Sequence, residues 1–389
     1  MRDTKIVILG AGVAGLRVAQ KLGSKLRHGE ASVTLIDENP YHQLLYKLHE
    51  VCNIEYEEKE IVVPLNRLIN NIDDIFIQTK VEEVDTDFNQ VHTSVGTYPY
   101  DILVIALGSH SAFFNIDGIV NHSKTLASYD QAKDIRARIL ELFAESEVTG
   151  VPPSIVIGGA GFTGVELAGE MIDWLPLLYK EHGLEEKEPF FTMVEAFSHI
   201  LPGWDDKLIE KVHAHLVKRG INIHLNDPVV EVGDKKLELR SGTVLEPDLF
   251  IWTGGVESDP VCRLGFQLRG RRIIVDDYLQ YAEYDGVFVL GDMACTVDNE
   301  GKPMPPNAHI AMSQADIVAH NIMASIKGNP LKKYRFAHAG EVVTVGRKFA
   351  VGELFGIRLT GFPARFMKRF IHIWYLHSIG GLGLALEGL

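Results

Sequence analysis

The chain has 389 residues, with 38 basic and 52 acidic side chains, and its formal net charge is −14. That length predicts about two or three domains, each able to bury a core, and a hydrophobic share of 46% excludes general disorder. The acidic balance argues against a nucleic-acid-binding protein, which usually has a basic surface. The three cysteines, Cys52, Cys262 and Cys295, lie far apart, so neither a disulfide scaffold nor a zinc ribbon is expected.

The first predicted elements are a strand, a glycine-rich turn and a helix. A short apolar strand leads into Gly10, Gly12 and Gly15, and a second strand ends at Asp37. Gly10 permits a tight turn, Gly12 lets the backbone approach a pyrophosphate, and Gly15 lets the helix pack closely on the strand. Asp37 is placed to accept hydrogen bonds from a ribose diol. This order of elements predicts a dinucleotide site rather than a merely structural turn. A further buried strand, later in the chain, ends at Gly108.

The same pattern recurs in the middle of the chain. An apolar strand leads into Gly159, Gly161 and Gly164, a helix follows, and a later strand ends at Glu195. Two such patterns in one chain imply two dinucleotides, and the economical chemistry for that pair is hydride transfer between a nicotinamide and a flavin. The sequence therefore predicts an α/β fold with two Rossmann-like dinucleotide-binding domains.

Two more apolar strands end in glycine after the second turn. Residues 248–255 repeat the form of the strand before Gly108, and residues 286–292 end in Gly291 and Asp292. An aspartate in that place is often an ordinary helix cap. In a flavin-binding chain it can instead accept a hydrogen bond from a ribityl hydroxyl.

The last part of the chain has an amphipathic pattern. Phe362, Phe366 and Phe370 recur at helical spacing. The basic residues Arg365, Lys368 and Arg369 lie among them. Apolar and aromatic residues beside basic ones are typical of a helix lying in a membrane interface. A terminal helix docked on the core or on a homodimer partner is the alternative. No apolar run approaches the ~20 residues needed to span a bilayer.

Taken together, these motifs resemble the two-dinucleotide-binding flavoproteins, the superfamily that includes glutathione reductase. More closely, the chain resembles the type II, non-proton-pumping NADH:quinone oxidoreductases. The resemblance rests on both glycine turns, on Gly291 and Asp292, and on four short motifs at residues 39–43 (NPYHQ), 163–167 (TGVEL), 252–256 (WTGGV) and 345–348 (VGRK). It implies an FAD domain over residues 1–112 and 255–330, an NADH domain over 113–254, and a C-terminal membrane-facing region over 331–389.

The resemblance also implies which residues hold the two dinucleotides. For the FAD cofactor they are Gly10, Gly12, Gly15, Asp37, Gly108, Gly291 and Asp292. For the substrate NADH they are Gly159, Gly161, Gly164 and Glu195. Because a carboxylate at Glu195 repels a 2′-phosphate and no arginine follows it closely, NADH is expected over NADPH.

Three residues are expected to act on the reacting groups. Glu166 lies on the first turn of the helix that follows the second glycine turn, where the helix dipole stabilises a carboxylate. The resemblance places it beside the flavin and the nicotinamide, where it orients them or relays protons. His309 and Ser313 stand where the family usually carries glutamines, so acceptor chemistry or proton delivery is expected to differ, and a purely structural His309 is the alternative. Lys368 matches a family position near the flavin and the quinone tunnel.

Cysteine usage separates this chain from its relatives. Disulfide reductases of the superfamily need two close cysteines after the second strand, and only Cys52 lies in that region. A single cysteine there suits peroxide or coenzyme A disulfide chemistry, but a small buried apolar role is the favoured interpretation. Three separated cysteines leave sulfide:quinone oxidoreductase open as an alternative.

The function implied is that of an enzyme on the cytoplasmic face of the cell membrane, held peripherally through anionic lipid. It transfers hydride from NADH to FAD and then two electrons to a membrane quinone, without pumping protons. The alternatives are a soluble flavin NAD(P)H oxidase or reductase, a sulfide:quinone oxidoreductase, and an NADH-sensing flavoprotein with slow turnover. No metal site is expected, because the histidines and cysteines lack ligand spacing.

Overall fold

The computed structural model describes residues 4–26, 29–52, 57–69, 75–186, 190–258, 265–298, 301, 303–336 and 340–388. The chain forms two compact units, each made of three segments. Unit 1 consists of Met1–Gln43, Val62–His110 and Glu257–Ala337, and unit 2 consists of Leu44–Ile61, Ser111–Val256 and His338–Leu389. Two short strands, β10 (Ser109–Ser111) and β19 (Val256–Ser258), lie where the chain passes between units.

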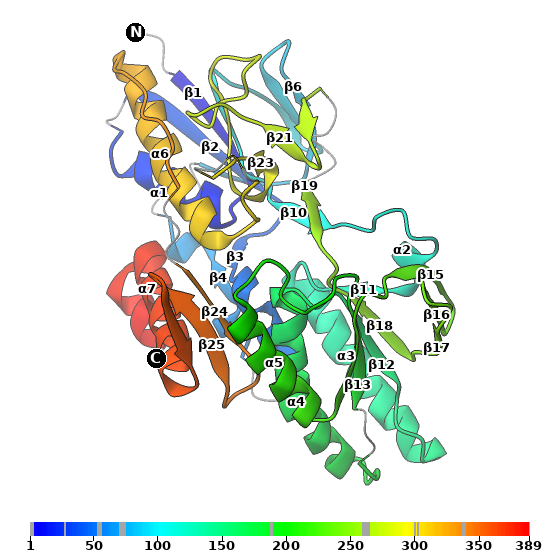
Figure 1. The fold of residues 1–389 in the computed structure, drawn as a ribbon. Coiled ribbons are helices and arrows are strands. Elements are labelled where there is room, and N and C mark those ends of the chain that lie inside the picture. The colour runs from blue at the N-terminus through cyan, green and yellow to red at the C-terminus, as the bar shows by residue number, and fades with distance from the viewer. Residues whose placement is uncertain are drawn as a thin grey trace. The chain divides into compact units, whose positions relative to one another are not determined.

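Unit 1 is built on a parallel five-stranded sheet. In spatial order its strands are β22 (Val287–Val289), β9 (Ile102–Ile105), β1 (Thr4–Leu9), β2 (Ala31–Asp37) and β5 (Phe76–Gln78). β9 and the last four residues of β1 are buried, as parallel strands covered on both faces are. Helices α1 (Val13–Gly23) and α6 (Ala308–Lys327) pack side by side (Figure 1).

Smaller sheets complete unit 1. They are the pair β3 (Tyr41–Gln43) and β4 (Val62–Pro64), the antiparallel sheet β6 (Val81–Asp85), β7 (Gln90–Thr93) and β8 (Gly96–Pro99), and the sheet β20 (Leu268–Arg269), β21 (Arg272–Ile274) and β23 (Ala294–Cys295). Two short 3₁₀ helices are η3 (Leu65–Arg67) and η6 (Gly291–Met293).

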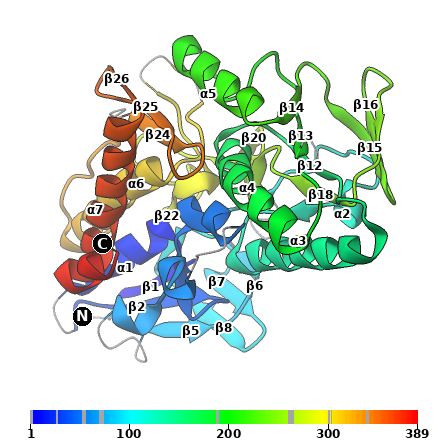
Figure 2. The ribbon, with the colours of Figure 1, turned by 90° about the horizontal axis from the view of Figure 1, so that it is seen from below.

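Unit 2 repeats the parallel arrangement. Its sheet has the order β11 (Lys124–Thr125), β18 (Leu249–Trp252), β12 (Ile155–Gly158), β13 (Phe191–Val194) and β14 (Ile221–His224). Its helices are α2 (Ile119–His122), α3 (Tyr129–Thr149), α4 (Phe162–Glu181) and α5 (Asp206–Lys218), with an antiparallel sheet of β15 (Val229–Gly233), β16 (Lys236–Leu239) and β17 (Val244–Leu245). In Figure 2, α3 and α4 lie side by side. The ring of Phe143 on α3 contacts the ring of Tyr179 on α4.

The end of the chain and an early segment also belong to unit 2. The end forms the antiparallel sheet β24 (Gly340–Thr344), β25 (Ala350–Leu354) and β26 (Ile357–Thr360), and then α7 (Phe362–Glu387), kinked at Gly381. The early segment forms the 3₁₀ helices η1 (Leu45–Cys52) and η2 (Glu58–Glu60). No described helix is long and apolar enough to cross a membrane.

Close packing explains why these segments join unit 2. A Cβ atom on Gly169 of α4 would collide with the backbone nitrogen of Gly346, so the turn after β24 lies directly on the helix. The sequence motif at residues 345–348 is therefore a packing contact, and η1 packs on both α3 and α4. The expected division at residues 112, 254 and 330 differs from the two units in two places: the C-terminal region is not separate, and Leu44–Ile61 leaves the first domain. Which cofactor each domain holds stays a prediction.

Candidate active site

The first glycine turn links β1 to α1 in unit 1. Gly10 has a φ of +94°, and a Cβ atom on Gly15 would collide with its carbonyl oxygen, so packing requires glycine at both places. At Gly12 the backbone is extended, with a φ of −68° and a ψ of −168°, and a Cβ atom would have no neighbour within 4 Å. The protein itself therefore does not require glycine at Gly12. An open backbone at a helix N-terminus fits a pyrophosphate.

Two side chains, the half-buried Asp37 and the fully buried His42, hold the peptide at Ala11. The Ala11 N–H donates to Oδ2 of Asp37 at 2.6 Å, and the other oxygen of Asp37 accepts from Asn39 at 2.8 Å. On the opposite side, Nδ1 of His42 lies 2.9 Å from the Ala11 carbonyl oxygen. Burial lowers the pKa of His42 to about 4, so the neutral ring donates its proton to that carbonyl. Sequence reasoning found Asp37 and gave no role to His42.

Gly291 and Asp292, the residues predicted to contact the ribityl chain of FAD, follow the end of β22. Asp292 accepts a hydrogen bond from Ser109 at 2.8 Å, and burial raises the pKa of its carboxyl. The side chain of Gln314, which is fully buried, accepts from the Gly291 N–H at 2.7 Å and donates to Thr296 at 3.1 Å. The turn at Gly291 is thereby fixed from α6, a role that sequence reasoning did not assign to Gln314.

The two expected acceptor positions on α6 differ in their surroundings. His309 is exposed at the second residue of the helix, where its backbone N–H donates to the Asn307 side chain at 2.7 Å. Ser313 is half-buried, donating to the Ile310 carbonyl at 2.8 Å and lying 3.0 Å from the Tyr334 hydroxyl. The hydroxyl of Ser313 thus contacts polar groups of unit 1, while the His309 side chain is exposed.

The second glycine turn links β12 to α4 in unit 2. Gly159 has a φ of +98°, and a Cβ atom on Gly164 would collide with its carbonyl oxygen. At Gly161 a Cβ atom again has no neighbour within 4 Å. Glu195 accepts the Ala160 N–H at 2.6 Å and the Phe197 N–H at 3.0 Å, so it reaches the turn as Asp37 does in unit 1.

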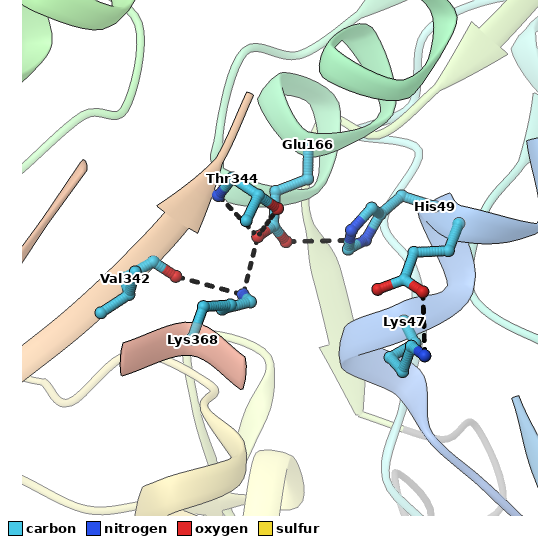
Figure 3. Close-up of polar contacts among 7 residues, drawn as sticks. Lys47, His49, Glu166, Val342, Thr344 and Lys368 are labelled. Carbon is cyan, nitrogen blue, oxygen red and sulfur yellow. Dashed lines mark hydrogen bonds and ion pairs between the residues drawn. The ribbon is translucent and has the colours of Figure 1, made fainter. Parts of the chain in front are cut away.

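Glu166 lies on the first turns of α4 and is the centre of a buried polar cluster (Figure 3). Its Oε1 accepts from Nζ of Lys368 on α7 at 2.7 Å, and from the hydroxyl and backbone N–H of Thr344 on β24 at 3.2 and 3.3 Å. Its Oε2 lies 3.6 Å from Nδ1 of His49 on η1. Lys368 also donates to the Val342 carbonyl at 3.1 Å.

The charge on Glu166 is held in place by this cluster. Burial alone raises the pKa of Glu166, but the charges of Lys368 and His49, with the hydrogen bonds from Lys368 and Thr344, outweigh it and hold the pKa below its usual value. Glu166 is therefore ionised at neutral pH. The structure brings Glu166 and Lys368 together, whereas His49 and Thr344 were missed by sequence reasoning.

Both described cysteines are free and buried. Cys52 is fully buried, and burial raises its pKa to about 12, so the thiolate needed for nucleophilic or redox chemistry does not form near neutral pH. Cys295 is also buried, and Cys262 lies outside the described residues. Among the residues that the structure describes, no group of three or more His, Cys, Asp or Glu side chains is placed to hold a metal ion.

Comparison with known proteins defines the class of this chain. The family model for pyridine nucleotide-disulphide oxidoreductases matches residues 4–315, so the chain belongs to that family. The type II NADH:quinone oxidoreductase of Staphylococcus aureus (strain NCTC 8325 / PS 47) is 32% identical over 398 residues, and the match covers 98% of each protein. Within the family, the chain therefore belongs to the type II NADH:quinone oxidoreductases.

Solved structures agree in fold. NDH2 from Plasmodium falciparum in complex with NADH matches with a TM-score of 0.86 at 16% identity, over 100% of this chain and 97% of that one. The sulfide:quinone oxidoreductase from Aquifex aeolicus matches with a TM-score of 0.79 at 21% identity, over 97% and 91% of the two chains. At these identities the likeness concerns the fold alone, and it confirms the predicted α/β architecture.

Proposed function

We propose that this chain oxidises NADH with a bound FAD and passes two electrons to a membrane quinone, without pumping protons. The observation that carries the proposal is the pair of open glycine turns, one in each unit, in a chain of this family. At Gly12 and at Gly161 the protein's own packing leaves the position of a Cβ atom empty. A bound pyrophosphate explains glycine at both places.

FAD is assigned to unit 1 and NADH to unit 2. In unit 1, Gly10, Gly12, Gly15 and Asp37 receive the adenosine half of FAD, and Gly108, Gly291 and Asp292 receive the ribityl half. In unit 2, Gly159, Gly161, Gly164 and Glu195 receive NADH. Bound FAD supplies a group that accepts a hydride and releases electrons to a poor hydride acceptor. The protein supplies position, orientation and exclusion of water.

Glu166 and Lys368 are assigned to the reacting end of NADH. Glu166 follows Gly164 by two residues on the same helix, and its ion pair with Lys368 at 2.7 Å keeps one carboxylate oxygen fixed. A buried, ionised carboxylate orients donors in the substrate and accepts a proton when one is offered. His309, exposed at the start of α6, is assigned to the electron acceptor.

Steady-state turnover with a panel of acceptors tests the proposal. FAD-loaded protein is mixed with NADH and, in separate runs, with a ubiquinone or menaquinone analogue, oxygen, a disulfide or sulfide. We expect fast NADH oxidation with quinone and stoichiometric quinol. Fast turnover with oxygen or a disulfide and none with quinone contradicts the proposal, as does sulfide oxidation or a stable reduced complex that does not turn over.

We also propose that α7 attaches the protein peripherally to the cytoplasmic face of the membrane. Four aromatic side chains at four-residue spacing are exposed on it: Phe362, Phe366, Phe370 and Trp374. Arg365 and Arg369 are exposed beside them, and each is worth about 1 kcal/mol near an anionic surface. Lys368, which the sequence grouped with these charges, is paired with Glu166 instead. The competing occupant of this face is a second copy of the chain in a homodimer.

Vesicle sedimentation separates these two occupants. A variant with Phe366→Ser and Phe370→Ser keeps Lys368. The control is Phe88→Ser, at an aromatic residue of unit 1 that is even more exposed than Phe366 and Phe370. We expect the double variant to remain in the supernatant with anionic vesicles, while the control pellets like the natural chain. Pelleting of all three, or a change only in the oligomeric state, contradicts the lipid assignment.

A further inference from the structure

The two oxygens of Glu166 have different surroundings. Oε1 accepts three hydrogen bonds, one from Lys368 and two from Thr344. Among the described residues, Oε2 lies against His49 alone, with Nδ1 at 3.6 Å (Figure 3). Oε1 is therefore saturated as an acceptor, and Oε2 is the oxygen with capacity to take a proton. The group that faces it is an imidazole, whose ring nitrogens can each carry a proton or accept one.

The fold fixes His49 in that place. Tyr46 and His49 are three residues apart on the 3₁₀ helix η1 and share one of its faces. Lys368 and His372 are four residues apart and share a face of α7. The Tyr46 hydroxyl lies 2.9 Å from Nδ1 of His372, so one polar link joins η1 to α7 and a second passes through Glu166.

In the link between Tyr46 and His372, the proton has one fixed place near neutral pH. Burial raises the pKa of Tyr46 well above its usual value and lowers the pKa of His372 to about 4. The proton therefore stays on the tyrosine oxygen, which donates to the neutral ring. The link between His49 and Glu166 joins a ring nitrogen to a carboxylate oxygen at 3.6 Å, and either atom can carry a proton.

We propose that His49 exchanges a proton with Oε2 of Glu166 during quinone reduction, which makes it a positioning and proton-supply residue that acts through the glutamate. The proposal rests on the proposed function. NADH, quinone and one proton give NAD⁺ and quinol, so two electrons and one proton come from NADH and the second proton comes from solution. In the step itself, the N–H bond of His49 breaks and an O–H bond forms on Oε2, with no change in oxidation state. A separation of 3.6 Å suits a pair that tightens when ligands bind.

Other charged groups surround the pair. Lys368 comes from α7, Lys47 and Glu50 lie beside His49 on η1 and form an ion pair of 2.9 Å, and Glu170 follows Glu166 by one turn of α4. Glu341 of β24 alternates to the face opposite Thr344. Lys368 is occupied by Oε1 and by the Val342 carbonyl, which leaves His49 as the group that meets Oε2.

Single-turnover kinetics of matched variants test the exchange. His49→Asn keeps an amide nitrogen near the place of Nδ1 but cannot titrate, and His49→Leu removes the polar contact. The control is His182→Asn, which breaks a histidine–glutamate pair of 2.6 Å with Glu147 at the far end of α4, roughly 24 Å along the helix from Glu166. FAD content and melting temperature of each variant report on folding.

The two half-reactions carry the result. We expect both His49 variants to be reduced by NADH at nearly the natural rate and reoxidised by a quinone analogue roughly 10²-fold more slowly, with loss of the deuterium-solvent effect on that step. His182→Asn keeps both rates. Reoxidation of His49→Asn at the natural rate overturns the proposal, because a fixed amide then suffices. An equal fall in both half-reactions also overturns it, because the residue is then merely structural.

Infrared spectroscopy gives a readout that does not depend on turnover. The carbonyl stretch of protonated Glu166, identified by its absence in Glu166→Gln, is followed against pH in the natural chain and in His49→Asn. Because the charge of His49 helps to hold the pKa of Glu166 down, the band should appear at higher pH in the variant. An unmoved midpoint overturns the pairing. If the natural protein fails to reduce quinone, the proposed function falls, while this measurement still decides whether the pair is coupled.

Discussion

The two glycine turns of the chain have nearly the same backbone. Gly10 and Gly159 have φ angles of +94° and +98°, and Gly12 and Gly161 have φ, ψ pairs of −68°, −168° and −71°, −170°. In each turn a carboxylate from the next strand accepts the alanine N–H at 2.6 Å. The same turn, which we propose receives a pyrophosphate, is thus built twice, in two units that share no segment of chain.

The turns differ in what holds the alanine carbonyl. The Ala11 oxygen accepts from the side chain of His42, whereas the Ala160 oxygen accepts from the backbone N–H of Leu201 at 2.7 Å. Thr253 adds a hydroxyl that donates to the Gly159 carbonyl at 2.9 Å in the second turn. The first turn is therefore stiffened by a buried titratable side chain and the second by groups that do not titrate near neutral pH. Similar cradles can differ in their response to pH.

Gly12→Val gives the largest expected effect. Because a Cβ atom at Gly12 meets no protein atom within 4 Å, the variant should fold, but the valine occupies the place assigned to the pyrophosphate. We expect purified protein without yellow colour and with a nearly unchanged circular dichroism spectrum. If the purified variant carries a full FAD complement, the assignment of FAD to unit 1 is wrong.

Gly161→Val should affect only the other dinucleotide. Its Cβ position is equally open, so we expect a full FAD complement together with a KM for NADH raised by roughly 10²-fold, equivalent to a loss of about 3 kcal/mol. Steady-state rates at increasing NADH concentration measure the change. Loss of FAD with NADH binding intact reverses the assignment of the two turns.

Acid should weaken the first turn more than the second. The native pKa of His42 is about 4 against an ordinary 6.5, so the unfolded chain binds more protons between these values and stability falls as pH falls from about 6.5 to about 4. The linked loss is at most about 3 kcal/mol for this fully buried ring. We expect FAD release in urea to become easier across that range in the natural chain and less so in His42→Asn. If FAD release depends on pH equally in both proteins, His42 does not cause the weakening. The same holds if the affinity for NADH falls in parallel with FAD release.

The smallest effect concerns the choice of nucleotide. Glu195→Ala removes a carboxylate that repels a 2′-phosphate and accepts from a 2′-hydroxyl. We expect kcat/KM for NADH to fall roughly tenfold, since a hydrogen bond to a charged group contributes about 1.5–3 kcal/mol. That for NADPH should rise, because the repulsion of its 2′-phosphate is lost. Steady-state kinetics with both nucleotides measures the ratio, and FAD content is the control. A natural chain that uses both nucleotides equally contradicts the role of Glu195.

The sequence predicted the turns because local geometry dictates their residues. A positive φ at Gly10 and a close approach at Gly15 leave glycine as the residue that fits, and the carboxylates end strands at readable positions. His42, Gln314 and Thr344 could not be read in the same way, because each acts on a partner set by packing between distant elements. The pair Glu166 and Lys368 spans 202 residues and was reached through family resemblance. His49, inside an otherwise structural 3₁₀ helix, gave no signal at all.

The most direct test of the account is an anaerobic double-mixing measurement on the FAD-loaded protein. NADH is mixed first and the flavin absorbance is followed; a quinone analogue is mixed second and the return of absorbance is followed. We expect NADH to bleach the flavin faster than NADPH does, and quinone to restore it faster than oxygen or a disulfide. The proposed function is contradicted if NADH does not reduce the flavin. It is also contradicted if oxygen, a disulfide or sulfide supports turnover of the flavin and quinone does not.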